Sequence, residues 1–160
     1  MSVKIYFDMD GTVFDLYGKA NWLDLLENEQ SGAFVGNFLP EIDLVRFFSA
    51  IKELSAYGVQ FGIITWLPMQ ASAEYEEVCR AEKMAWIREN MPFISEFNCV
   101  SYGTPKQKCI QKRVQTMYLI DDNAEVCKMW ETATQRKALN IDKEWTVVDA
   151  LETIIEEVIF

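Results

Sequence analysis

Apolar residues along this chain fall into short continuous runs separated by stretches with helical spacing. Three runs, at 3–7, 59–65 and 115–120, are rich in β-branched and aromatic residues, which is typical of buried strands. A less regular run at 97–102 is expected to be a fourth strand. Apolar positions at helical spacing predict helices around 22–26, 44–54, 74–90, 126–130 and 151–158. Strands therefore alternate with helices along the chain.

This alternation predicts an α/β fold, with a three-layer Rossmann-like parallel sheet joined by right-handed crossovers. The 160 residues match one ordinary domain, and neither a repeat nor a linker rich in Gly, Ser or Pro divides them. Residues 1–160 are therefore interpreted as a single domain. Ligands of such sheets bind at the carboxyl ends of the strands, so the residues after each predicted strand are the ones to search for chemistry.

The chain contains no histidine, which excludes Ser-His-Asp and Cys-His catalysis and HExxH zinc sites. Its net charge of −10 argues against general nucleic-acid binding and against attachment to a membrane surface. The four cysteines form no Cys-x-x-Cys pair and are expected to be reduced core residues. The sequence shows no signal-peptide core, and no apolar run approaches the roughly 20 residues that cross a bilayer. A cytoplasmic protein without a membrane segment is expected.

Polar residues follow the predicted strands in a definite order. Residues 8–12 (Asp-Met-Asp-Gly-Thr) follow the first strand, Thr65 ends the second, Lys106 follows the fourth, and Asp121-Asp122 ends the run at 115–120. Two aspartate charges about 4 Å apart repel by about 4 kcal/mol at an effective dielectric constant near 20, so four of them need a cation. Oxygen ligands suit Mg²⁺ best. The sequence therefore predicts a Mg²⁺ site formed by Asp8, Asp10, Asp121 and Asp122.

Each of these motifs also has an ordinary interpretation. Asp-x-Asp-Gly is a common turn after a strand, threonine is a frequent strand residue, a loop lysine is usually solvated, and an Asp-Asp pair can cap a helix. An EF-hand loop is excluded, because a strand precedes the motif and its twelfth position is Lys19. A phosphoacceptor receiver domain is disfavoured, because there the acidic pair comes first. The order of the motifs on successive strands favours one common site.

With these motifs in this order, the sequence resembles the haloacid dehalogenase (HAD) superfamily of phosphohydrolases, and the resemblance spans Asp8 to Asp122. It implies that Asp8 is the nucleophile and Asp10 the general acid/base. It also implies that Thr65 binds the phosphoryl group and that Lys106 holds both nucleophile and phosphate, with Lys108 as the alternative lysine. Asp122 is expected to bind Mg²⁺ directly and Asp121 through water. Backbone N–H groups of the Asp10-Gly11-Thr12 turn and of Trp66 are expected to help bind the phosphate.

Within the superfamily, four segments resemble the 5′(3′)-deoxyribonucleotidase family: 8–11 (Asp-Met-Asp-Gly), 82–87 (Glu-Lys-Met-Ala-Trp-Ile), 102–106 (Tyr-Gly-Thr-Pro-Lys) and 119–122 (Leu-Ile-Asp-Asp). Relatives carry a larger helical cap after the first motif. Here only 55 residues separate Asp10 from Thr65, which leaves room for a short helical cap at about 15–40.

Aromatic and basic residues near the predicted site are open to two interpretations. Tyr17, Trp22, Phe34 and Phe38 are candidates either to stack on a base or sugar or to pack in the core, and helical spacing favours the core for Trp22. The basic residues Lys106, Lys108, Lys112 and Arg113 either attract an anionic substrate or form a solvated face.

These features together predict a Mg²⁺-dependent phosphomonoester hydrolase that works through an aspartyl-phosphate intermediate. The expected substrate is a small phosphorylated molecule, with a deoxynucleoside monophosphate as the first candidate. The alternatives are another small phosphate ester, a phosphorylated macromolecule, or a noncatalytic module that binds Mg²⁺ and phosphate. Short-capped relatives use a neighbouring subunit to cover the site, so an oligomer is also open.

Overall fold

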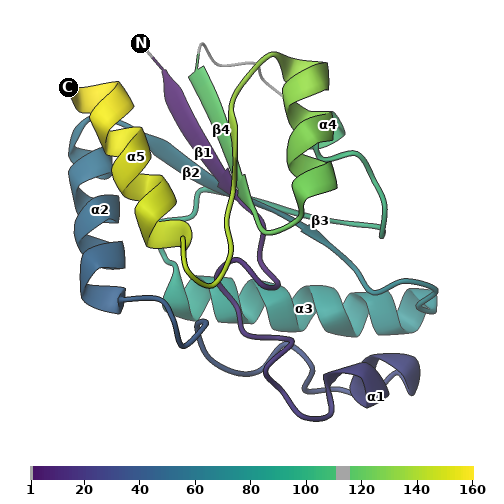
Figure 1. Cartoon of the computed structure of the whole chain (residues 1–160). Helices are drawn as coiled ribbons and strands as arrows, with labels where there is room; N and C mark the ends of the chain where they lie inside the picture. Colours follow the sequence, from purple (N-terminus) through teal and green to yellow (C-terminus); the bar gives the residue numbers. More distant parts are fainter. Residues whose placement is uncertain (1, 111–115) are drawn as a thin grey trace.

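A computed structural model describes residues 2–110 and 116–160 and shows a five-stranded, all-parallel sheet in the order β3-β2-β1-β4-β5 (Figure 1). The strands are β1 (Val3–Phe7), β2 (Gln60–Trp66), β3 (Glu96–Val100), β4 (Thr116–Asp121) and β5 (Ala138–Asn140). The helices are α1 (Trp22–Glu27), α2 (Leu44–Ala56), α3 (Ala73–Asn90), the 3₁₀ helix η1 (Lys106–Cys109), α4 (Ala124–Thr134) and α5 (Val147–Ile159). The predicted α/β fold with a parallel sheet is confirmed.

The four predicted strands and five predicted helices are all present, with ends shifted by a few residues. Two strand predictions extend beyond what is observed: 97–102 ends two residues earlier, and Gln115 lies outside the described residues. The sequence patterns did not predict β5 or η1.

Side chains on the two faces of the sheet enter two separate cores. Along β1, Ile5 and Phe7 pack into a large core that also receives side chains of α2, α3 and α5, whereas Tyr6 faces a smaller core shared with α4 and η1. The Tyr6 ring meets the Trp130 ring of α4 edge to face, with centroids 5.8 Å apart. Because strand residues alternate between faces, this division produces the predicted three layers (Figure 1).

The central strand β1 lies at the point where the direction of the chain connections reverses. The chain moves outward on one side of β1 through β2 and β3, and then returns to form β4 and β5 on the other side. The carboxyl ends of β1 and β4 therefore border the crevice in which ligands of parallel sheets bind.

The segment at 15–40 leaves β1 and returns to nearly the same place. The Asp15 N–H donates to the Asn37 carbonyl at 3.0 Å, and the Leu39 N–H donates to the Val13 carbonyl at 2.9 Å. Helix α1 lies between these two contacts, within the segment that was expected to be the cap and is called the cap below. Within the described residues, no helix combines the length and the apolar character needed to cross a membrane.

Candidate active site

The loop after β1 is a tight turn that brings its residues close to the acidic pair after β4. The Met9 carbonyl accepts hydrogen bonds from the N–H groups of residues 12–14, at 2.9 to 3.2 Å. Gly11 has a φ of +80°, and a Cβ atom there would lie 2.4 Å from Oδ2 of Asp122. Glycine is therefore required both by the backbone conformation and by the close approach of Asp122.

Asp8 is held in place by two donors. The buried Lys106 ammonium donates to Oδ1 of Asp8 at 2.8 Å and to Oδ2 of Asp121 at 2.7 Å, and the Thr12 hydroxyl donates to Oδ2 of Asp8 at 3.1 Å. Burial opposes the charge on Lys106, but Asp8 and Asp121 outweigh it and raise the pKa of Lys106 above its usual range. The structure therefore brings Lys106 to Asp8, whereas Lys108 is exposed.

Gly11, Thr12 and Trp66 were also predicted to contact the phosphate. The N–H groups of Gly11 and Thr12 donate to carbonyls within the turn, at 3.0 and 3.2 Å. Trp66 lines the cleft, and its indole N–H donates to the Thr104 carbonyl at 2.8 Å. The phosphate-binding roles expected for these three residues stay predictions. Lys112 and Arg113 lie outside the described residues.

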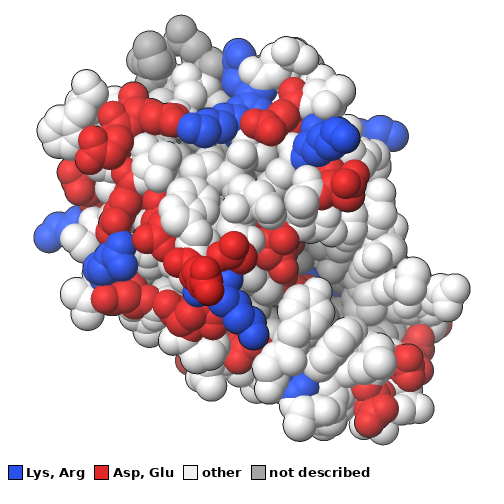
Figure 2. Space-filling view, viewed as in Figure 1, with Lys and Arg blue, Asp and Glu red and all other residues white. Residues whose placement is uncertain are grey.

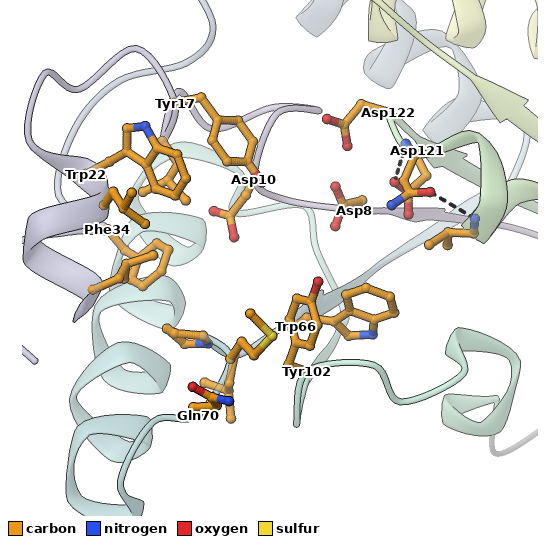
Figure 3. Close-up of a pocket in the computed structure, with 18 of the residues that line it drawn as sticks. Asp8, Asp10, Tyr17, Trp22, Phe34, Trp66, Gln70, Tyr102, Asp121 and Asp122 are labelled. Carbon is orange, nitrogen blue, oxygen red and sulfur yellow. Dashed lines mark hydrogen bonds between the residues drawn. The ribbon is translucent and has the colours of Figure 1, made fainter.

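Three carboxylates form a cluster at the ends of β1 and β4, at the switch point where the direction of the chain connections reverses. Asp8, Asp121 and Asp122 each present an oxygen within 4.8 Å of the others (Figure 3). Both oxygens of Asp121 accept hydrogen bonds, one from Lys106 at 2.7 Å and one from the Asn123 N–H at 3.0 Å. Burial and the neighbouring charge of Asp8 raise the pKa of Asp121 to about 6. Desolvation in the cleft is the largest cause that raises the pKa of Asp122 to about 8. The negative charges of Asp8 and Asp121 raise this pKa further.

These residues fit a divalent cation. All the donor atoms are carboxylate oxygens, which suit Mg²⁺. The four aspartates predicted as ligands and the two buried lysines near them, Lys83 and Lys106, carry a formal charge of −2, which one Mg²⁺ would neutralise. The Asp10 carboxylate is not part of the three-residue cluster, so a metal role for Asp10 stays a prediction.

The Asp10 carboxylate is instead paired with Lys83, a residue of α3 to which the sequence analysis gave no role. The Lys83 ammonium donates to Oδ2 of Asp10 at 2.8 Å, to Oγ1 of Thr65 at 2.7 Å and to the Trp66 carbonyl at 2.7 Å. Burial raises the pKa of Asp10 above its ordinary value, although Lys83 opposes this effect. Thr65 is itself fully buried beneath this group of contacts.

A signal for Lys83 is present in the sequence. The buried side chains of α3 are Tyr75, Cys79, Lys83, Trp86 and Ile87, which recur at the spacing of one helical face. Lys83 is thus a charged residue in the middle of an apolar stripe. A lysine in that position is buried only when it has partners, so the pattern itself points to an internal ion pair.

A cleft of about 430 Å³ opens above these carboxylates. Its walls include five aromatic side chains, those of Tyr17, Trp22, Phe34, Trp66 and Tyr102 (Figure 3). The rings of Tyr17 and Trp22 meet edge to face at 5.0 Å, and those of Trp66 and Tyr102 lie 5.1 Å apart. Of the four aromatic residues singled out in the cap, Tyr17, Trp22 and Phe34 line this cleft. Phe38 packs instead against Phe47 and Trp86.

Trp22 combines both interpretations considered for it. Its side chain is half-buried and packs against the large core, and the same side chain lines the cleft. Phe34 is 2% exposed, so it closes the inner end of the aromatic wall, whereas Tyr17 and Tyr102 are each 54% exposed and stand at its outer rim.

The cap is attached to α3 by several polar contacts. The Glu82 carboxylate accepts hydrogen bonds from the N–H groups of Gly32 at 2.7 Å and Phe34 at 3.2 Å. The Tyr75 hydroxyl donates to the Gln30 carbonyl at 2.8 Å, and the Trp86 indole N–H donates to the Gly36 carbonyl at 2.9 Å. The aromatic wall that the cap contributes is therefore fixed relative to α3.

Comparison of the chain with models of known protein families and with curated proteins finds no match.

Proposed function

We propose that this protein is a Mg²⁺-dependent phosphomonoester hydrolase of the HAD type. The observation that carries the proposal is the placement of Asp8. It follows the central strand at the switch point, accepts hydrogen bonds from Lys106 and Thr12, and lies beside the carboxylates of Asp121 and Asp122. A carboxylate so held, next to a fixed ammonium and a cluster suited to a cation, is equipped for nucleophilic attack on an anionic phosphate.

The proposed reaction has two chemical steps. A carboxylate oxygen of Asp8 attacks phosphorus, and the P–O bond to the leaving group breaks. Asp10 donates a proton to the leaving-group oxygen. Water then attacks the aspartyl phosphate, Asp10 takes a proton from the water, and the Asp8 carboxylate and inorganic phosphate are released. Lys106 offsets negative charge on the phosphoryl oxygens in both steps.

Mg²⁺ held by Asp8 and Asp122, with Asp121 at the edge of the site, would supply further positive charge beside the phosphate. The hydrogen bonds to both oxygens of Asp121 support an outer role for this residue, while Asp122 remains the exposed member of the pair.

The walls of the cleft support a substrate with a flat apolar group, and a deoxynucleoside monophosphate remains the first candidate. Aromatic side chains from the cap and from the ends of β2 and β3 would stack on such a group. The lysine that lines the cleft, Lys106, is already paired with Asp8 and Asp121. A second phosphate would therefore find carboxylates and aromatic rings rather than a free cation among the described lining residues.

The test is phosphate release from a panel of phosphate esters, including deoxynucleoside monophosphates, with Mg²⁺ or with a chelator. Asp8→Asn should lower turnover by at least about 10³-fold, because the amide is not a nucleophile, while thermal unfolding stays close to that of the unchanged protein. Full turnover by Asp8→Asn would exclude the proposed nucleophile. Release from none of the esters would exclude small phosphate esters as substrates and favour a macromolecular substrate or a binding module.

A further inference from the structure

Lys83 is a buried cation that the reaction described above does not use directly. Its side chain is fully buried on α3, and its three N–H donors are all satisfied, by Asp10, by Thr65 and by the Trp66 carbonyl. The Phe34 ring covers a further side of the ammonium, with its centroid 4.5 Å from Nζ. Taking an ammonium out of water is costly unless all its donors are satisfied, and here they are.

These contacts fix the position of the ammonium independently of Asp10. Two of the three hydrogen bonds go to the end of β2, a central part of the sheet, and the stem of the side chain belongs to a long helix. The Phe34 backbone is in turn tied to Glu82, the neighbour of Lys83 on α3. The nitrogen that meets Asp10 therefore stands on a rigid frame built from β2, α3 and the cap.

The two oxygens of Asp10 differ because of this arrangement. Oδ2 accepts from Lys83 at 2.8 Å, whereas Oδ1 is buried and has no hydrogen-bond partner among the described residues. Asp10 also lines the cleft, two residues after Asp8. A carboxylate in this place that lacked Lys83 would be free to rotate toward Lys106 or toward a cation at the three-aspartate cluster.

We propose that Lys83 is a positioning residue, which holds the Asp10 carboxylate through Oδ2 in the wall of the cleft where Asp10 serves the leaving group. This inference rests on the proposed function, in which Asp10 protonates the leaving oxygen. It assigns to α3 a part in the reaction geometry, although no residue of α3 directly follows the end of a strand, where the other site residues lie. It also explains why a lysine stands in the apolar stripe of this helix.

The consequence is a dependence on the leaving group. Poor leaving groups need a correctly placed acid, whereas good ones depart without a proton. For Lys83→Met, which keeps the length of the side chain but removes the ammonium, we expect kcat/KM to fall by about 10²-fold with alkyl phosphates and by less than about tenfold with nitrophenyl phosphates. Across a series of substituted phenyl phosphates, the rate of the variant should depend more steeply on the acidity of the phenol than that of the unchanged protein.

The matched control is Trp86→Phe, on the next turn of the same helix. It removes the hydrogen bond from the indole to Gly36 and leaves Lys83, Asp10 and Thr65 in place. We expect lower thermal stability without a change in leaving-group dependence. An equal loss with all leaving groups in Lys83→Met would assign a purely structural role to Lys83 and overturn the proposal.

Crystal structures of the unchanged protein and of Lys83→Met supply a readout that does not need turnover. We expect the Asp10 carboxylate to leave its position in the variant while Asp8 and Lys106 keep theirs. An unmoved Asp10 would overturn the inference even if the protein is a phosphatase. A displaced Asp10, in a protein that releases phosphate from no ester, would support the positioning role and reject the proposed function.

Discussion

Asp8 and Asp10 are separated by one residue, yet each is paired with a different lysine from a different part of the chain. Asp8 meets Lys106 of η1 at 2.8 Å, and Asp10 meets Lys83 of α3 at 2.8 Å. The two lysines approach from different elements, so the two carboxylates have different partners. Two chemically identical groups thereby acquire distinct surroundings, which is the condition for one to act as nucleophile and the other to move protons.

The buried pair of Lys106 and Asp121 should contribute to stability as well as to catalysis. For Lys106→Ala we expect the free energy of unfolding, measured with urea in the presence of a chelator, to fall by about 3 kcal/mol, because Asp121 loses the partner of a buried charge. Turnover should fall with it. Lys108→Ala is the matched control, since Lys108 is exposed two residues away, and its stability should stay within about 0.5 kcal/mol of the unchanged protein. The reverse ranking of the two variants would contradict the assignment of Lys106.

At the scale of elements, most of the sheet could be predicted from the sequence, because buried parallel strands are continuous apolar runs. Residues 3–7 match β1 at both ends for this reason. β5 escaped prediction because it has only three residues, Ala138–Asn140, which is too short for a periodic pattern. η1 escaped because a single 3₁₀ turn has no apolar stripe of its own.

The convergence of Asp8, Lys106 and Asp121 was predictable, because it depends only on which strand each residue follows. The pairing of Lys83 with Asp10 was not predicted, because it depends on how α3 packs across the end of β2. A helix position relative to a sheet is fixed by side-chain packing, and motif spacing along the chain carries no information about it. The aromatic walls of the cleft belong to the same class, since they require the placement of the cap.

A salt bridge between β1 and β3 crosses the intervening strand β2. The Lys4 ammonium donates to Oε1 of Glu96 at 2.7 Å, and the Asn98 amide donates to Oε2 at 2.9 Å. Gly62 of β2 lies between Tyr6 and Glu96 in register, and its lack of a side chain leaves room for the Tyr6 ring. Burial opposes ionisation of Glu96, but the hydrogen bonds and charge of Lys4 outweigh it, so the pKa of Glu96 is lowered.

The lowered pKa of Glu96 predicts a specific pH dependence of stability. The stabilisation is fully present above the unfolded pKa of about 4.3 and is lost as the pH falls through the lower folded pKa. We expect Lys4→Met to lower the free energy of unfolding by about 1 to 3 kcal/mol at pH 7, and the difference from the unchanged protein to shrink below about pH 4. Urea unfolding at several pH values measures this, with the exposed Lys52→Met as control. A difference that stayed constant down to pH 3 would exclude ionised Glu96 as its source.

At the scale of the whole molecule, negative charge dominates both the surface and the centre. The net charge is −10, and acidic side chains outnumber basic ones on the face shown in Figure 2. The three aspartates of the cluster add to this at one point, with oxygens within 4.8 Å of one another. Such an arrangement is unfavourable for folding and favourable for binding a cation. We therefore expect the repulsion to lower the stability of the folded protein when no cation is bound.

Mg²⁺ should therefore stabilise the folded protein, and removal of one carboxylate from the cluster should abolish most of this stabilisation. At a Mg²⁺ concentration of 100 Kd, binding to the folded state contributes about 2.7 kcal/mol, which for a chain of this size raises Tm by about 5–10 °C. At about pH 9, above the pKa of about 8 that Asp122 has without a cation, Asp122→Asn removes one repelling charge beside Asp8 and Asp121, so in chelator its Tm should be higher than that of the unchanged protein. The same variant should lose most of its response to Mg²⁺, because Asp122 is the exposed ligand of the cluster.

Calorimetric scans of both proteins, each with Mg²⁺ and with chelator, separate these effects. Repulsion among the aspartates predicts that the two proteins change rank: the variant is the more stable in chelator, and the unchanged protein is the more stable in Mg²⁺. A variant that is less stable under both conditions would mean that Asp122 supports the fold directly, and an unchanged protein that does not respond to Mg²⁺ would exclude the cluster as its binding site. The exchange of rank is therefore the outcome that ties the destabilising charge at the switch point to the cation that the proposed chemistry requires.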